Sequence, residues 1–474
     1  MRKLMENIFH LKDLNTTIRT EVIAGLTTFM TMAYIIFVQP AVLSGSMFGI
    51  STGMDFGAVT VATCIATAIA TTIMALYANY PIAVAPGMGE NFFFVFSVMP
   101  AALALGFTNA WQVALGVVFV AGILFYILFL IGIREKIFDA ISPSMKNGIA
   151  AGIGLFIAFI GLQNAGLIIK SPGTIVKMNS NFSSPDLIIF FFGVILTVIL
   201  HTRKIRGSIL WGILGTTVFA SCLKILLPLL PKAISESKIV AESMLMTRFA
   251  IANKIISKPP SLAPIFLKMD ILHALSLALW PFIIMHLYMD VFDTVGTLIG
   301  IGEQAGFMKG NKLPRGRQAM FSDQAGTVVG AVLGTSTVTS YIESATGVEA
   351  GGRTGLTSLV VALLFLFALF FSPIVAMIGS YPQITAPALV LVGAMMMRNV
   401  NRIQWSDYSE SIPAFLALVG IPLSYSISDG LALGFIAYPI VKLFSGRQRE
   451  VSWLSYVLAV ILIFYFVFLK ARSG

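Results

Sequence analysis

Charged residues are scarce in this sequence of 474 residues. They make up 11% of it, against roughly 25% in an ordinary soluble domain. Hydrophobic residues make up 57%, and the mean hydropathy is +0.90. This composition excludes a soluble globular protein and predicts an all-α polytopic membrane protein. At about 20 residues per span, the chain has room for about fourteen or fifteen transmembrane segments.

Cysteine and histidine are also scarce. Cys64 and Cys222 both lie inside apolar segments, and the four histidines are scattered without the spacing of metal ligands. We therefore expect no disulfide, no metal site and no cofactor other than a coupling ion. An intramembrane enzyme would need a nucleophile with a base, or a metal cluster, and the sequence suggests neither. We expect a protein that is not an enzyme.

The positive charge of the chain is explained by topology. The net charge is +10, and its excess falls in short loops between apolar segments, so we expect no nucleic-acid partner. The first 19 residues are polar and mixed in charge, which is unlike a cleavable signal peptide. By the positive-inside rule the N-terminus is cytoplasmic, as are the basic loops around Arg134 and Lys136 and around Lys309 and Lys312. We expect an integral plasma-membrane protein, in a bacterium the inner membrane.

One apolar stretch, residues 80–96, cannot form a continuous helix. Pro81 and Pro86 remove backbone donors, and Gly87 and Gly89 permit a sharp turn. We expect an extended segment followed by a half-helix that starts near Gly89. Irregular backbone at membrane depth survives only where protein or solute covers it, so this break is a candidate binding site. Glu90 and Asn91 would lie in the first turn of the half-helix, next to its positive dipole end.

The second half of the chain repeats this pattern. A helix rich in Gly, Ala and Thr begins at Phe321, and a stretch rich in β-branched and hydroxyl residues follows from Thr335 and turns at Glu343. The same order, small-residue helix, extended segment and acidic half-helix, runs from Ala62 to Glu90. Two repeats of seven spans have opposite orientations, because seven is odd. The sequence predicts a 7+7 inverted-repeat transporter with about 14 segments, two of them broken, although residues 412–469 could supply two or three spans.

Asp290 and Asp293 form a third candidate element, in the eighth span. They are three residues apart, so they lie near each other on one side of a helix. A carboxylate at membrane depth is costly and marks a pathway for protons, ions or solute. Asp290, Asp293, Glu343 and Glu90 are therefore predicted to be the only plausible proton carriers in the spans.

Four segments resemble a known family. They are residues 20–36, 78–91, 292–298 and 343–357, and they are similar to the AzgA-like adenine/guanine/hypoxanthine permeases of the nucleobase/ascorbate transporter superfamily. The resemblance covers nearly the whole chain. It implies proton-coupled purine uptake, a homodimer, and a core domain that moves against a gate domain. The implied divisions are core 1–140, gate 141–230, connection 231–269, core 270–380 and gate 381–474.

The resemblance also implies roles for residues. Asn91 would orient the purine, and Asp290 and Glu343 would hold the purine or the coupling proton. The other predicted contacts are Gly89, Phe92 and Ser344. The family pattern has an apolar residue where this chain has Glu90 and a small one where it has Phe92, which leaves the preferred purine open.

Several alternatives remain at this level. Asp293 neighbours Thr294 and Thr297, so a supporting hydrogen bond is the main alternative to proton coupling. Glu90 either couples protons or only complements the helix N-terminus. The whole protein could instead carry uracil, xanthine or an anion on the same fold, and a channel is a remote alternative.

Overall fold

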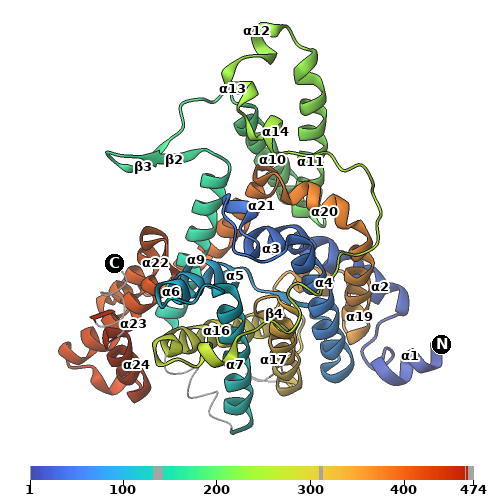
Figure 1. The fold of residues 1–474 in the computed structure, drawn as a ribbon. Helices are drawn as coiled ribbons and strands as arrows, with labels where there is room; N and C mark the ends of the chain where they lie inside the picture. The colour runs from blue at the N-terminus through green and yellow to red at the C-terminus, as the bar shows by residue number, and fades with distance from the viewer. Residues whose placement is uncertain (1, 132–141, 309–312, 465, 468–474) are drawn as a thin grey trace.

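The computed structural model describes residues 2–131, 142–308, 313–464 and 466–467. The chain is mostly helical, as Figure 1 shows. In the part of the chain that it describes, ten helices are long and apolar enough to cross a membrane. The loop residues Arg134, Lys136, Lys309 and Lys312, which we expect on the cytoplasmic side, lie outside the described residues.

The first half begins with a short helix α1 (Arg2–Phe9) and a span made of α2 (Ile18–Met32) and α3 (Ile35–Leu43). The following elements are α4 (Phe56–Ile73), β1 (Val84–Pro86), α5 (Met88–Phe93), α6 (Met99–Ala104), α7 (Ala110–Ile131), α9 (Pro143–Asn164), α10 (Pro185–Thr202) and α11 (Ser208–Leu226). An antiparallel hairpin of β2 (Ile168–Ser171) and β3 (Ile175–Met178) follows α9 and stands away from the helices in Figure 1. The sequence analysis did not predict this hairpin.

The connection between the halves contains α12 (Lys232–Ser235), α13 (Lys238–Ala241), α14 (Met244–Thr247) and α15 (Ile271–Ala274). The second half contains α16 (Trp280–Gln304), α17 (Gly316–Leu333), β4 (Val338–Ser340), α18 (Ser344–Glu349), α19 (Gly355–Ala368), α20 (Ser372–Gly379), α21 (Pro382–Met396), η7 (Met397–Arg402), α22 (Tyr408–Ser424), α23 (Ile427–Phe444) and α24 (Trp453–Phe464). Residues 412–469 were predicted to supply two or three spans. The structure has three helices there, α22 to α24.

Both predicted breaks are present, and they meet. β1 and β4 pair antiparallel, with Val84 opposite Ser340 and Pro86 opposite Val338. Matching threonines hold the two strands: Thr71 on α4 donates to the carbonyl of Val84 (2.9 Å), and Thr327 on α17 donates to the carbonyl of Val338 (3.0 Å). The same local bond, made by the equivalent helix in each half, is what an inverted repeat produces.

The first break follows from its local sequence. Asn79 ends the preceding helix in a left-handed conformation, and Gly87 is the N-cap of α5, so the half-helix begins at Met88. A Cβ on Gly87 would collide with the Glu90 carboxylate, which folds back over the start of its own helix. Glycine is therefore required for the close approach of Glu90 to the N-terminus of α5.

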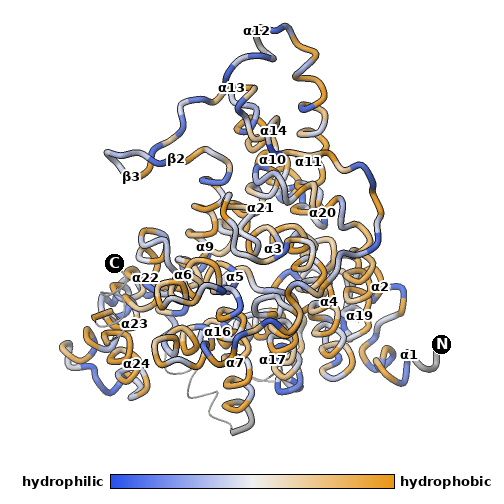
Figure 2. Tube along the Cα trace, in the orientation of Figure 1, coloured by the Kyte–Doolittle hydropathy of each residue, from blue (hydrophilic) through white to orange (hydrophobic). Residues whose placement is uncertain are grey.

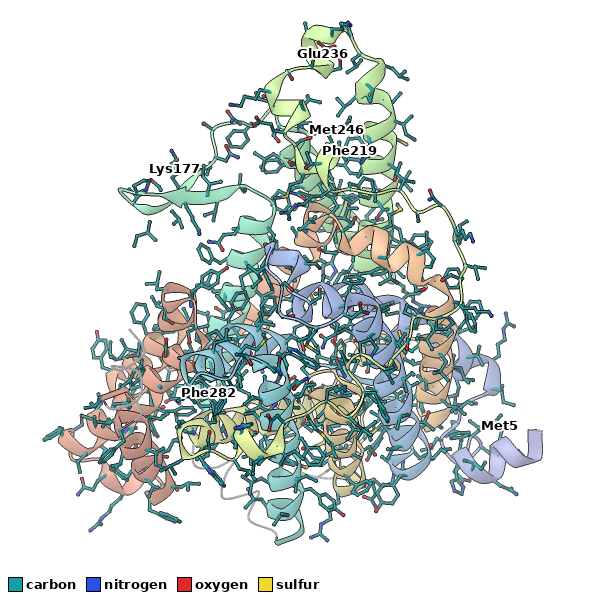
Figure 3. All side chains as sticks on the ribbon, in the orientation of Figure 1. Met5, Lys177, Phe219, Glu236, Met246 and Phe282 are labelled. Atoms are coloured by element: carbon teal, nitrogen blue, oxygen red, sulfur yellow. The ribbon has the colours of Figure 1, made fainter. Side chains whose placement is uncertain are left out.

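Polar residues are distributed as a membrane protein requires. Figure 2 shows long apolar stretches along the helices and hydrophilic segments mainly in the connections. Among the side chains labelled in Figure 3, Glu236 and Lys177 stand at the periphery, on the connection and on the hairpin, whereas Phe282 lies in the helical body. Phe282 is 1% exposed and belongs to the main hydrophobic core.

A buried ion pair joins the last helices. Lys442 on α23 has no exposed surface, and its Nζ lies 2.7 Å from Glu410 Oε1 on α22 and 2.8 Å from Glu450 Oε2. Glu450 lies after α23, and hydrogen bonds from Arg447 and Lys442 lower its pKa to about 2. Because this pKa is depressed on folding, the Glu450 contribution to stability is present near neutral pH and is lost only as the pH falls toward that value.

Lys442→Met should lower the melting temperature of the protein in detergent. It leaves Glu410 without its cationic partner, and breaking a buried pair costs about 3–5 kcal/mol, with partial exposure of Glu450 favouring the lower end. Lys232→Met is the matched control, because the Lys232–Glu236 pair is 3.8 Å long and exposed, and such pairs contribute about 1 kcal/mol or less. Equal melting temperatures for the two variants would show that the buried ion pair of Lys442 does not stabilise the protein more than an exposed pair does.

Candidate functional site

A cavity of about 670 Å³ opens where the two broken segments meet. On one side it is lined by the start of α5, the middle of α16, the end of β4 and the start of α18. On the other side it is lined by α9, the end of α21 with η7, and α23. The volume lies within the roughly 300–1,000 Å³ of small-molecule sites.

Three carboxylates line the first wall. Glu90 lies in the first turn of α5, Asp293 lies in α16, and Glu343 is the N-cap of α18. Asp293 belongs to a transmembrane helix, yet its side chain is exposed to the cavity, and Glu343 is partly exposed to it. The start of α5 therefore brings first-turn N–H groups that have no intrahelical acceptor to the same space as three acceptor side chains. At the start of α18, by contrast, the first three N–H groups already donate to backbone carbonyls. Such a wall can both donate and accept hydrogen bonds.

Tyr34 orients one of these carboxylates. Its hydroxyl donates to Glu343 Oε1 at 2.8 Å, and its ring lines the cavity. Tyr34 lies at the break between α2 and α3, where Ala33 ends one helix and Ile35 begins the next. A second tyrosine, Tyr341, donates its hydroxyl to the carbonyl of Pro86 and so holds the two breaks together.

Two predicted site residues lie behind this wall and do not line it. Asp290 is 2% exposed, and its Oδ1 has no hydrogen-bond partner. Asn91 is fully buried; its Oδ1 accepts from the Ser336 hydroxyl, while its Nδ2 has no partner. Asp290 is on α16 and Asn91 is on α5, and other residues of both helices line the cavity.

Of the remaining predicted contacts, one lines the cavity and two do not. Gly89 lines the cavity. Phe92 is fully buried in an aromatic cluster, with ring centroids 6.2 Å from Phe48 and 6.1 Å from Phe156. Ser344 is also buried, and its Oγ accepts from the backbone N–H of Ala83 at 3.0 Å. In this structure Phe92 and Ser344 are placed to support the site from outside the cavity.

The opposite wall has different chemistry. It presents two cationic and two amide side chains near the ends of α9 and η7, namely Lys146, Asn147, Asn399 and Arg402. Deeper in, Phe435 on α23 lies against Tyr288 on α16, with ring centroids 5.9 Å apart. The cavity is thus acidic on one side, basic at part of the other, and aromatic where the two sides meet.

Two residues of this region were not predicted from the sequence. Tyr34 was not singled out, because no proline or glycine marks the break between α2 and α3. The second is Asp323, which is fully buried on α17. That four carboxylates are the only plausible proton carriers stays a prediction. Asp323 lies two residues after Phe321, where the predicted span begins. No group of three His, Cys, Asp or Glu residues placed to hold a metal ion was found in the described part of the chain.

Comparison with known proteins decides the family. A family model described as "Permease family", that of the nucleobase/ascorbate transporters, matches residues 19–469. The chain belongs to this permease family. The family predicted from the four segments is therefore confirmed.

Relatives of the permease cover its whole length. It is 50% identical over 469 residues to a putative permease of Methanocaldococcus jannaschii, with 99% of each chain covered. It is 42% identical to the guanine/hypoxanthine permease PbuG of Bacillus subtilis, covering 98% of this chain and 100% of that one. It is 39% identical to the adenine permease AdeP of Escherichia coli, covering 99% and 97%.

A solved structure shows the fold. The transmembrane domain of the cyanobacterial bicarbonate transporter BicA superposes with a TM-score of 0.60, at 14% identity, covering 88% of this chain and 96% of that domain. At this identity the similarity concerns the fold alone. The permease has the predicted 7+7 inverted-repeat fold and is an integral membrane protein.

Tyr34→Phe should weaken substrate binding without unfolding the permease. The change removes only the hydroxyl that donates to Glu343, and the ring can still pack in the same place. A hydrogen bond to a charged group contributes about 1.5–3 kcal/mol, so we expect KM to rise about tenfold or more. Transport kinetics of purified protein would measure it. Tyr438→Phe, on α23 and outside the cavity lining, is the control, and equal KM values for the two variants would contradict the role of Tyr34.

Proposed function

We propose that this permease is a secondary active transporter that imports purine nucleobases, namely adenine, guanine or hypoxanthine, by proton symport. The observation that carries the proposal is the cavity at the crossing of the two breaks, with Glu90, Asp293 and Glu343 on one wall. The relatives named as guanine/hypoxanthine and adenine permeases support purines as the substrate class.

The chemistry of the wall suits a purine edge. A purine offers ring N–H donors beside ring nitrogen acceptors. A carboxylate accepts N–H donors, and the backbone N–H groups in the first turn of α5 can donate to ring nitrogens or to an exocyclic oxygen. The rings of Tyr288 and Phe435 offer an aromatic surface for the flat base.

Proton coupling follows from the same residues. A carboxylate that takes up a proton with the purine becomes neutral, so the loaded site can move past apolar surface without an exposed charge. We assign this role to Glu343, Asp293, Asp290 and Glu90. Asp290 lies behind the wall, and its unpartnered Oδ1 suits a group that holds a proton within the protein.

We further propose that transport occurs by movement of two domains across the cavity. The core would comprise residues 1–140 and 270–380, and the gate residues 141–230 and 381–474, joined by 231–269. In support, α9 packs against α21 and α22, while α4 packs against α17 and α19, so each proposed domain draws on both halves of the chain. A homodimer, and a cytoplasmic N-terminus, complete the proposal.

Uptake into proteoliposomes tests the proposed function. Radiolabelled adenine, guanine, hypoxanthine and uracil would be offered with and without an inward proton gradient. We expect saturable accumulation of at least one purine that depends on the gradient, and no accumulation of uracil. Purine uptake that is the same with and without the proton gradient would refute symport. The absence of any purine uptake by folded protein would refute purines as the substrate class.

A further inference from the structure

Asp323 is a buried carboxylate that the proposed function does not use. It has no exposed surface and lies on α17, outside the lining of the cavity. Its Oδ2 accepts from the backbone N–H of Ser340 at 2.6 Å and from the Ser340 hydroxyl at 2.7 Å. Its Oδ1 accepts from the Thr294 hydroxyl at 2.7 Å and from the Gln324 amide at 3.4 Å.

Three of these bonds join α17 to the two elements that carry Asp293 and lead to Glu343, and the fourth, from Gln324, stays within α17. Thr294 directly follows Asp293 on α16, and its hydroxyl also lies 3.2 Å from that of Thr339 on β4. Ser340 ends β4, lines the cavity, and precedes Glu343 by three residues. Asp323 therefore ties the turn of α16 that presents Asp293 to the strand end that presents Glu343.

The inverted repeat shows that a carboxylate is not needed to hold such a strand. Asp323 lies four residues before Thr327, the threonine that holds β4, and Thr67 lies four residues before Thr71, the threonine that holds β1. Thr67 is buried, and its hydroxyl has no partner. β1 is thus secured without a bond from this position, whereas the second half places a charged group there and surrounds it with donors.

We propose that Asp323 is a positioning residue for substrate binding: it sets the separation of Asp293 and Glu343 by tying α16 to the end of β4. The inference rests on the proposed function, because it explains what holds two carboxylates of the proposed purine site at a fixed distance. A displacement of about 1 Å in a binding constellation is enough to change its performance by about a hundredfold. Asp323 would then contribute to substrate binding from outside the cavity, because it prevents a displacement of Asp293 relative to Glu343.

Asp323→Asn tests the proposal, because it keeps the shape of the side chain and replaces one acceptor oxygen with a donor. At least one of the backbone N–H of Ser340, the Ser340 hydroxyl, the Thr294 hydroxyl and the Gln324 amide then loses its acceptor. We expect the KM for purine to rise about tenfold, with turnover per folded transporter changed less than about threefold. Thr67→Val, the matched change at the equivalent position of the first half, should leave both unchanged.

A second readout does not depend on purine. A Cβ at Gly300 on α16 would lie 3.6 Å from Ile342 Cδ1, between β4 and α18, and both residues line the cavity. Gly300→Cys and Ile342→Cys, in a Cys222→Ser background, can be joined by a short bifunctional thiol reagent, since the other native cysteine, Cys64, is buried. We expect Asp323→Asn to lose most of the cross-linking yield and Thr67→Val to retain it.

The outcomes separate this inference from the proposed function. A raised KM with lost cross-linking, in Asp323→Asn alone, supports it. An unchanged KM overturns it, whatever the cross-linking yield, and so do equal effects of Thr67→Val. If the unmodified site binds no purine while cross-linking still depends on Asp323, the proposed function fails and the positioning role stands.

Discussion

Glu343→Gln should abolish gradient-driven purine accumulation. Glutamine keeps the length and the acceptor oxygen of the side chain, so the bond from Tyr34 can persist, but it cannot take up and release a proton. Without that proton the inward gradient is no longer coupled to the purine. We expect accumulation to fall to the level of equilibration, a loss of about tenfold for each pH unit of imposed gradient when one proton is coupled.

The measurement is uptake of labelled purine into proteoliposomes with an imposed proton gradient. Glu349→Gln is the matched control, because Glu349 ends the same short helix, α18, and is exposed outside the cavity lining. Exchange of purine without a gradient, measured in the same vesicles, reports whether the variant still binds its substrate. Accumulation by Glu343→Gln equal to that of the unmodified protein would rule out its role in coupling.

Asp293→Asn should produce a loss of similar size. Its carboxylate faces the cavity from α16, close enough to Glu90 and Glu343 to interact with both electrostatically. The asparagine amide keeps one acceptor oxygen but places an NH2 donor where the carboxylate has its second acceptor, so it can no longer accept two purine N–H groups. An unpaired donor in a binding site reduces affinity by about 1–3 kcal/mol, and loss of a coupling proton would add to it.

Thiol labelling provides the geometric control for this prediction. Asp293→Cys should react with a water-soluble reagent that enters the cavity. A cysteine at position 290 should react far more slowly, because Asp290 is 2% exposed and lies behind the wall. Faster labelling at 290 than at 293 would show that the face of α16 has been assigned wrongly, and normal transport by Asp293→Asn would remove Asp293 from the mechanism.

The two breaks could be predicted because their causes are local. Pro81, Pro86 and Gly87 disallow a helix wherever they occur in that order, and the observed half-helix begins at Met88, one residue before the predicted start near Gly89. The break at Tyr34 has no such cause. Residues 33 and 34 keep helical backbone angles, so the interruption is a matter of hydrogen bonding in the folded protein.

The choice between Asp290 and Asp293 could not be made from spacing. Two residues three apart on a helix point in directions that differ by about 60°, so both are compatible with one buried side. The packing of α16 against α17 and β4 turns Asp293 toward the cavity and Asp290 away from it. For the same reason Asn91, Phe92 and Ser344 adjoin the site in sequence while their side chains lie outside its lining.

The sequence by itself determined that this chain is a polytopic membrane protein, that it contains two related halves, and that each half is interrupted next to an acidic residue. These properties depend on composition, on the backbone limits of proline and glycine, and on the cost of charge in hydrocarbon, all of which act locally. Only the tertiary structure decided that the two interruptions pair, that Asp293 and Glu343 share a cavity with Tyr34, and that Asp323 ties their supports together. Those relations join residues far apart in the chain, and they exist only once the two halves have packed against each other.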